Sequence, residues 1–171
     1  MVLAALMVLF PLLMLYAAFS DLFTMTIPNK ISLLLLAGFV VLAFAIPLPI
    51  KDVGLHLLIG FCVLAAGFGL FALGVMGGGD AKFAAGIALW LGYSSVTIAF
   101  LLQMAIYGAI LTLVLLVFRS VPVIPAFAQR YDWVLKLHDK KTGIPYGIAI
   151  AIAALQVYPK TFWFEIAASG F

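Results

Sequence analysis

The feature that most constrains the fold is residues 83–118, a run of 36 residues without a formal charge. As one helix this run would be about 54 Å long at 1.5 Å per residue, whereas the apolar core of a bilayer is about 30 Å thick. The run is therefore too long for a single membrane crossing. We expect a break within the sequence Gly92, Tyr93, Ser94 and Ser95.

The composition of the whole chain indicates a membrane protein. Of its 171 residues, 67% are hydrophobic and 9% are charged, whereas soluble domains average about half and about a quarter. This composition also excludes a disordered chain. Because Cys62 is the single cysteine, an internal disulfide and a multi-cysteine zinc site are excluded. In a membrane protein the positions of the Lys and Arg residues behind the net charge of +3 indicate orientation. We therefore expect no nucleic-acid partner.

Hydropathy predicts an all-α polytopic membrane protein with six transmembrane helices in a single domain, residues 1–171. The expected spans are 2–19, 31–46, 55–76, 83–93, 96–118 and 143–158, with a loop at 119–142. Seven of the nine Lys and Arg residues lie in the loops at 20–30, 77–82 and 119–142, all on one side of the membrane. By the positive-inside rule that side is cytoplasmic, so both termini are expected outside the cytoplasm.

The long cytoplasmic loop contains an amphipathic pattern. Phe127, Tyr131, Val134 and Leu135 fall at helical spacing on one face. We expect a short helix here that lies in the membrane interface, either to tie down the loop or to dock a substrate.

Two of the six acidic residues, Asp21 and Asp80, lie next to the cytoplasmic ends of expected spans. Two crossings separate them, so the chain returns to the same side and the carboxyls can meet. Each residue also has a structural explanation. Asp80 follows three glycines and could be a helix N-cap. Asp21 lies at a helix C-terminus, where the macrodipole disfavours negative charge, so pairing with Lys30 or Lys82 would explain it.

Two carboxyls in one partly desolvated site suit acid–base chemistry. They cannot both ionise easily, so one pKa rises and the pair holds a single proton. The ionised member can then take a proton from water while the protonated member polarises a carbonyl, as in an aspartic protease. Gly77, Gly78 and Gly79 would allow a peptide to approach the backbone beside Asp80, and would allow dihedrals closed to other residues.

Other candidate residues have simpler explanations. Lys82 either tunes Asp80 or marks the cytoplasmic boundary, and we favour the boundary. Pro28 and Asn29 are typical of a stop followed by an N-cap. His56 and His138 are expected on opposite sides of the membrane, so we expect no shared metal site.

Three motifs in order resemble one protein family. Gly77-Gly78-Gly79-Asp80 with Lys82 resembles the G-x-G-D signature of intramembrane aspartyl proteases. Ser20-Asp21 followed by Ile27-Pro28-Asn29 resembles the first-aspartate segment of the bacterial type IV prepilin peptidases. Pro145-Tyr146-Gly147 resembles the last-helix motif of their small branch, which serves Flp (tight-adherence) pili.

The resemblance implies a function. Asp21 and Asp80 would be the catalytic pair of an endopeptidase in the bacterial cytoplasmic membrane, and the substrate would be a prepilin or pseudopilin cut after a glycine to remove its short basic leader. Water is the nucleophile, so no metal or organic cofactor is expected. Methyltransferase activity is not expected either, because the paired-cysteine region of larger relatives has no counterpart. The chain departs from many relatives in having no Arg shortly after Asp21.

Two other functions remain open on the residues alone. A small proton-coupled transporter could use Asp21 and Asp80 as a proton relay, although acids nearer mid-membrane and repeated halves would be expected there. A non-catalytic assembly subunit of a pilus or secretion machine could use the spans as a scaffold. Replacing either Asp with Asn separates these from a protease, since only a protease would lose cleavage.

Overall fold

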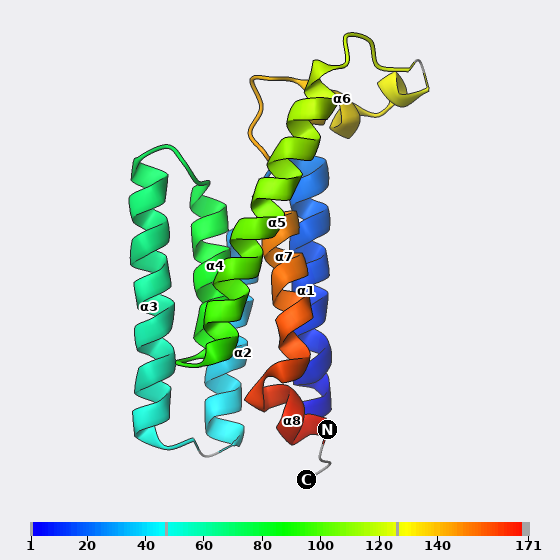
Figure 1. Cartoon of the computed structure of the whole chain (residues 1–171). Helices are drawn as coiled ribbons and strands as arrows, with labels where there is room; N and C mark the ends of the chain where they lie inside the picture. The colour runs from blue at the N-terminus through cyan, green and yellow to red at the C-terminus, as the bar shows by residue number, and fades with distance from the viewer. Residues whose placement is uncertain (1, 47, 126, 169–171) are drawn as a thin grey trace.

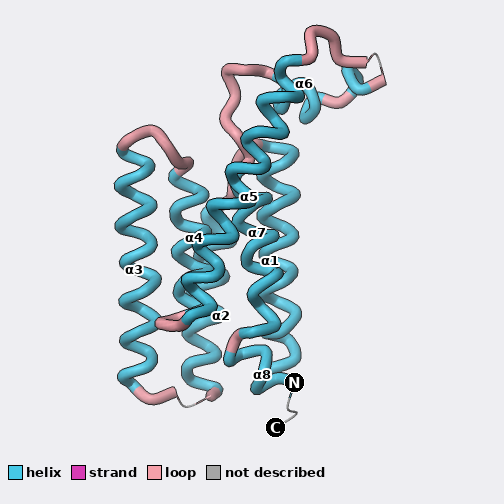
Figure 2. Tube along the Cα trace, in the orientation of Figure 1, coloured by secondary structure: helices cyan, strands magenta, loops and turns pink. Residues whose placement is uncertain are grey.

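The computed structural model describes residues 2–46, 48–125 and 127–168, which form helices joined by loops (Figures 1 and 2). The α-helices of this part of the chain are α1 (Val2–Thr24), α2 (Asn29–Ala45), α3 (Ile50–Ala72), α4 (Gly78–Leu91), α5 (Ser95–Ser120), α6 (Asp132–His138), α7 (Tyr146–Val157) and α8 (Phe162–Ala168), with short 3-10 helices η1 (Ala128–Arg130) and η2 (Tyr158–Lys160). The predicted all-α class is therefore confirmed. The six longest helices overlap the six expected spans.

Helix α4 is the centre of the bundle. It packs against α2, α3 and α7, and nearly all its side chains are buried. Helix α3 lies at one edge of the bundle and α1 at the other, while α5 crosses obliquely and extends beyond the rest to reach α6 (Figure 1). Helices α1 and α2 meet at the same end of the bundle as the start of α4 and the start of α7 (Figure 1). That end is the one relevant to the candidate site.

Small residues let α3 approach α4 closely. A Cβ added to Gly67 would lie 2.9 Å from the Cβ of Ala81, and one added to Gly60 would lie 3.1 Å from the Cβ of Leu89. Packing through small residues is the usual route to close helix contact in membranes. The start of α4, which carries Asp80, is held tightly in this way.

Two helices within the described residues are long and apolar enough to cross a bilayer, α3 and α5. Their most apolar windows have mean hydropathies of 2.2 and 2.4, and 11% and 17% of those windows are buried inside the protein. The segment Val8–Thr24 of α1 and the whole of α2 are apolar as well but shorter. Because few residues of α3 and α5 are buried inside the protein, much of their apolar surface faces outward, where lipid would be a better solvent than water.

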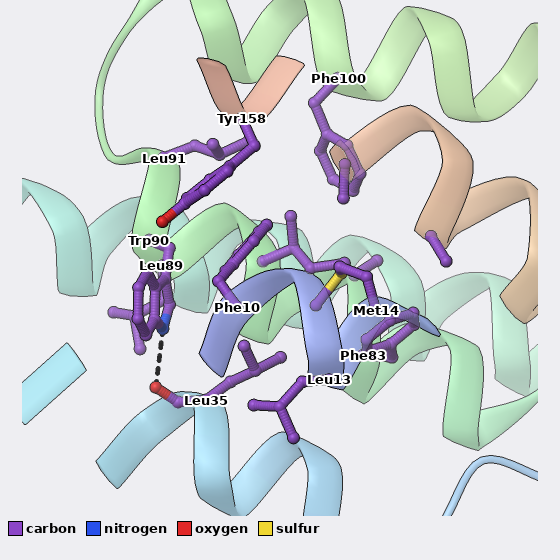
Figure 3. Packing of buried hydrophobic residues seen from close by; sticks show 14 of the residues in the cluster. Phe10, Leu13, Met14, Leu35, Phe83, Leu89, Trp90, Leu91, Phe100 and Tyr158 are labelled. Atoms are coloured by element: carbon purple, nitrogen blue, oxygen red, sulfur yellow. Dashed lines mark hydrogen bonds between the residues drawn. The ribbon is translucent and has the colours of Figure 1, made fainter. Parts of the chain in front are cut away.

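The buried core runs along the bundle from Ile27 and Phe83, near the start of α4, to Trp90 at the other end of that helix (Figure 3). The Trp90 indole Nε1–H donates a hydrogen bond to the Leu35 carbonyl of α2 at 2.7 Å. Phe10 of α1 packs beside Trp90, at 5.2 Å between ring centroids, and stacks on Tyr158 at 4.6 Å. This cluster joins α1, α2, α4 and η2 into one body.

The break in the long uncharged run lies at residues 92–94, within the expected segment. Gly92 has φ +64, a conformation that favours glycine, and ends α4. Ser94 begins α5 as its N-cap, because its side chain accepts a hydrogen bond from the Thr97 N–H at 3.3 Å.

Helix α3 ends earlier than expected. The sequence placed its end at Met76, directly before the three glycines, whereas α3 ends at Ala72. Gly74 has φ +71, its N–H donates to the Phe71 carbonyl, and the Val75 N–H donates to the Leu70 carbonyl. This is a Schellman motif, which satisfies carbonyls at the helix end. The triple glycine is therefore free to start α4.

The single amphipathic helix expected in the long loop is wrong. Tyr131 has an extended backbone, φ −111 and ψ 112, which separates η1 from α6. Of the expected apolar face, Phe127, Tyr131 and Leu135 are exposed. The buried residue of α6 is Leu137, and Trp133 packs edge-on against Phe23 of α1. These contacts attach the loop to the end of α1.

Candidate active site

Asp21 lies in the last turn of α1 and is 4% exposed. Its carboxylate Oδ2 accepts a hydrogen bond of 2.7 Å from the backbone N–H of Gly147, the second residue of α7. The first N–H groups of a helix have no partner within it, and the N-terminal end of the helix dipole favours negative charge. The start of α7 therefore offsets the unfavourable dipole at the end of α1.

Asp80 is the third residue of α4 and is 9% exposed. The N-cap of α4 is Gly77, so the expectation of Asp80 as a plain N-cap is wrong. The Asp80 carboxylate instead reaches back to accept a hydrogen bond from the Gly77 backbone. In a capping box the side chain of the third helical residue accepts a hydrogen bond from the N-cap backbone N–H, and Asp80 has this role here.

The two carboxyls line one cavity of about 290 Å³. They come from segments 59 positions apart in the sequence and lie close enough for the charge of Asp21 to act on Asp80. The other lining residues are Met25, Thr26, Ile27, Asn29, Gly77, Gly78 and Gly79. The structure thus brings together Asp21, Asp80, the triple glycine and Asn29.

Neither carboxylate forms an ion pair with a described Lys or Arg residue, so the expected pairing of Asp21 with Lys30 or Lys82 is absent from the described part of the chain. Lys82 Nζ instead donates a hydrogen bond to the Asn29 side-chain oxygen at 3.1 Å. The N-cap of α2 is Pro28 and Asn29 is its first helical residue, so Asn29 is not the N-cap. The Asn29–Lys82 contact ties the start of α2 to α4 beside the cavity.

The three glycines do not use dihedrals closed to other residues. Gly77 has φ −70 and ψ 141, an extended conformation, and Gly78 and Gly79 are helical. Glycine at position 77 leaves room for the Asp80 carboxylate, because an added Cβ would lie 2.6 Å from Asp80 Oδ2. Gly147 has the same role for the other acid, since a Cβ there would lie 2.8 Å from Asp21 Oδ2.

The motif Pro145-Tyr146-Gly147 positions the start of α7. Pro145 is the N-cap of the helix. The Tyr146 hydroxyl and the Thr112 hydroxyl of α5 are 3.0 Å apart, and the Tyr146 ring lies against Gly108, where an added Cβ would be 2.5 Å from the ring. Tyr146 therefore fixes α7 against α5 while Gly147 faces Asp21.

Sequence reasoning missed the connection between α1 and α2. Met25 has φ +58, which is rare for a residue with a side chain and costs about 1–2 kcal/mol. The Ser20 hydroxyl donates to the Thr26 carbonyl at 3.0 Å and holds this turn. Ile27 lies between Gly79, the neighbour of Asp80, and Gly147, the partner of Asp21, because an added Cβ on either glycine would contact it. Nothing in the sequence signals a left-handed Met25.

Arg119 was expected only to mark the cytoplasmic side. The structure places it in the last turn of α5, 8% exposed, with no carboxylate partner among the described residues. Its guanidinium donates to the Leu137 carbonyl at 2.7 Å, the Thr142 hydroxyl at 3.2 Å and the Gly143 carbonyl at 2.8 Å. Arg119 thus holds α6 and the segment that leads into α7.

Among the described residues no three His, Cys, Asp or Glu side chains gather as a metal site. His56 and His138 each bond to a backbone carbonyl, those of Leu89 and Val121. The candidate site is therefore a pair of buried carboxyls, each held by a backbone N–H, at one end of an apolar helical bundle. This arrangement suits acid–base chemistry on a peptide or another polar substrate that reaches that end.

Comparison with known proteins agrees with this class. The model of the type IV leader peptidase family matches residues 8–115, which include Asp21 and Asp80, and the chain belongs to this family of membrane-embedded, aspartic-type peptidases. The match ends before Arg119 and Pro145. No curated protein and no solved structure gives a significant match.

Proposed function

We propose that this chain is a prepilin peptidase that uses Asp21 and Asp80 to remove the leader of Flp-type prepilins or pseudopilins. The cut follows a glycine at the cytoplasmic face of a bacterial inner membrane. Membership of the type IV leader peptidase family supports the reaction class. The motifs around Asp21 and Asp80 support a prepilin peptidase, and the motif Pro145-Tyr146-Gly147 supports the small Flp branch.

The observation that carries the proposal is that Asp21 and Asp80 line one cavity although they come from different helices. In the proposed mechanism one carboxyl is protonated and the other is ionised. The ionised carboxylate takes a proton from water, and the resulting hydroxide attacks the scissile carbonyl. The protonated carboxyl donates a hydrogen bond to the carbonyl oxygen, and the pair then returns a proton to the leaving amine.

The backbone N–H groups of Gly147 and Gly77 support this role in a specific way. A carboxylate that accepts one N–H keeps a fixed rotamer and still has lone pairs on its other oxygen for water or a proton. Each acid is therefore oriented without a cation that would hold it permanently ionised. Gly77, Gly78 and Gly79 line the cavity without side chains, which supports the approach of an extended peptide backbone to Asp80.

In the proposed membrane arrangement the chain crosses six times, and the cavity lies at the cytoplasmic boundary. A prepilin whose leader stays in the cytoplasm would present its scissile bond there, just before its hydrophobic helix. The seven Lys and Arg residues of the loops at 20–30, 77–82 and 119–142 support this orientation.

The test is cleavage of a tagged Flp-type prepilin co-expressed with the wild-type chain, with Asp21→Asn, with Asp80→Asn, or with empty vector. Cleavage is read as a gel shift, and the new N-terminus is sequenced. A shift that needs both acids, with the new N-terminus directly after a glycine, is the expected result. Cleavage by either Asn variant would overturn the assigned pair, and no cleavage by folded wild-type chain with several prepilins would favour a transporter or scaffold.

A further inference from the structure

A second cavity of about 290 Å³ is lined by residues from the end of α4 and the starts of α3 and α5. These helix ends lie away from the end of the bundle that carries the candidate active site (Figure 1). Its polar lining residues are Asp52, His56, Tyr93, Ser94, Lys160 and Thr161, and both Trp90 and Trp163 contribute to its walls. The cavity combines one acidic residue, one basic residue and aromatic walls, and the proposed peptidase reaction uses none of them.

Several polar groups of the walls are already engaged within the protein. Trp163 Nε1–H donates to the Trp90 carbonyl at 2.6 Å. The Thr161 hydroxyl donates to the Tyr158 carbonyl at 2.7 Å, and the Ser94 hydroxyl donates to the Leu91 carbonyl at 3.0 Å. These bonds make the walls rigid and remove those donors from use by a ligand.

His56 offers a hydrogen-bond acceptor. Its Nδ1 lies 2.7 Å from the Leu89 carbonyl oxygen, and since a carbonyl only accepts, Nδ1 carries the proton. In the neutral ring Nε2 is then an acceptor, and it has no partner among the described residues. The ring is seated on Gly92, where an added Cβ would lie 2.5 Å away, and against Trp163, at 5.8 Å between centroids.

Asp52 lies one turn before His56 on α3, so the two side chains share a helix face. Both residues line the same cavity, Asp52 with a carboxyl group and His56 with an imidazole whose Nδ1 is bonded to the Leu89 carbonyl. This pair suits a primary ammonium group, which has N–H donors for both. A quaternary ammonium group has no N–H and cannot bond to His56.

Lys160 and Tyr93 present donors to the same cavity, an ammonium group and a hydroxyl. Lys160 forms no ion pair with Asp52 or another described acid, and the Tyr93 hydroxyl has no described partner. These donors suit a phosphate group. The opposite charges thus line one space without neutralising each other directly.

We propose that this cavity binds a phosphoethanolamine group, with the ammonium at Asp52 and His56 and the phosphate at Lys160 and Tyr93. The group is present in the headgroup of phosphatidylethanolamine and in the free compound. The cavity lies at the ends of α3 and α5, the two helices long and apolar enough to cross a bilayer. This position is the level of a membrane at which a lipid headgroup lies.

The test uses the purified full chain, reconstituted with equal amounts of phosphatidylethanolamine, phosphatidylcholine and phosphatidylglycerol, and native mass spectrometry of the bound lipid. The wild type should retain phosphatidylethanolamine at least about tenfold over phosphatidylcholine. Asp52→Asn should reduce this preference about tenfold, because the two lipids differ only in the ammonium group. Lys160→Gln should lower the retention of both lipids about tenfold, because the phosphate is common to them. The matched controls are Asp132→Asn, another first-turn acid, and Lys51→Gln, an exposed neighbour outside the cavity.

Soluble phosphoethanolamine distinguishes the two sources. Displacement of the lipid by the soluble compound would support recognition of the free group, and retention against it would support the lipid. Equal binding of phosphatidylcholine, an unchanged preference in Asp52→Asn, or unchanged lipid retention in Lys160→Gln would overturn the proposal. A preference for phosphatidylglycerol that depends on Lys160 alone would also overturn it. Lys160 is exposed, so Lys160→Gln remains informative if Asp52→Asn misfolds.

Discussion

The two acids of the candidate site are held by the same kind of contact but from very different distances along the chain. Asp80 accepts the N–H of Gly77, three residues away in its own helix turn. Asp21 accepts the N–H of Gly147, which is 126 residues away. The Asp80 half of the site is therefore local, whereas the Asp21 half depends on how α1, α5 and α7 pack together.

This difference shows how a membrane protein can place a costly carboxyl at the end of an apolar helix. At Asp80 the helix start itself supplies the donor and the favourable dipole. At Asp21 the dipole of its own helix is unfavourable, so another helix start must supply both. The Asp21 half is accordingly the one that remote substitutions should disturb.

The largest expected effect is loss of either acid. Asp21→Asn and Asp80→Asn should each lower kcat of prepilin cleavage by about 100- to 10,000-fold, because each removes a group that handles a proton. The double variant should lose little more than either single variant, since the two carboxyls act as one unit. Initial rates of cleavage by purified enzyme measure this. Losses that simply multiply would show that the acids act independently.

Gly147→Ala tests the remote half of the site. The added Cβ would lie 2.8 Å from both Asp21 Oδ2 and Ile27 Cδ1, so the carboxylate must move. A displacement of about 1 Å can cost about 100-fold in rate, and we expect a loss of that order. Gly143→Ala is the matched control, because an added Cβ there has no neighbour within 4 Å. Equal activity of the two variants would contradict the role of Gly147.

Arg119→Gln should weaken the same half from further away. It removes bonds to the Leu137 and Gly143 carbonyls and so loosens the segment that leads into α7. We expect kcat to fall about tenfold with little change in KM, and unfolding to become easier by about 1–3 kcal/mol. Arg119→Lys should recover part of kcat.

The matched control for Arg119 is Arg130→Gln, since Arg130 is exposed at the end of η1. A rise in KM alone would assign Arg119 to substrate binding. A loss of stability with unchanged kcat would assign it to folding only.

The smallest effect on kcat is expected at the Asp80 half of the site. In Gly77→Ala the new Cβ would lie 2.6 Å from Asp80 Oδ2, the far end of a side chain that can rotate. The backbone of Gly77 is compatible with alanine, so stability should hardly change while kcat falls about threefold. Gly69→Ala, with no neighbour within 4 Å of its added Cβ, is the control. A loss larger than that of Gly147→Ala would reverse the comparison between the two halves.

The sequence alone determined the all-α class, the break near Gly92 and the segments that hold both acids. These features follow from composition, from the length of apolar runs and from short motifs, which are local properties of the chain. The sequence misplaced the end of α3, because Gly74 ends it through a Schellman motif before the triple glycine is reached. It also gave Asn29 and Asp80 cap roles that belong to Pro28 and Gly77.

Only the tertiary structure decided what surrounds each acid. Packing between distant segments decides three features of the site. They are the left-handed Met25, the Gly147 N–H at Asp21 and the hydrogen bonds of Arg119 to the segment before α7. A pattern along the chain records which residues are apolar, small or charged. It does not record which helix start faces which carboxyl, because that is set by the summed packing of α1, α5 and α7.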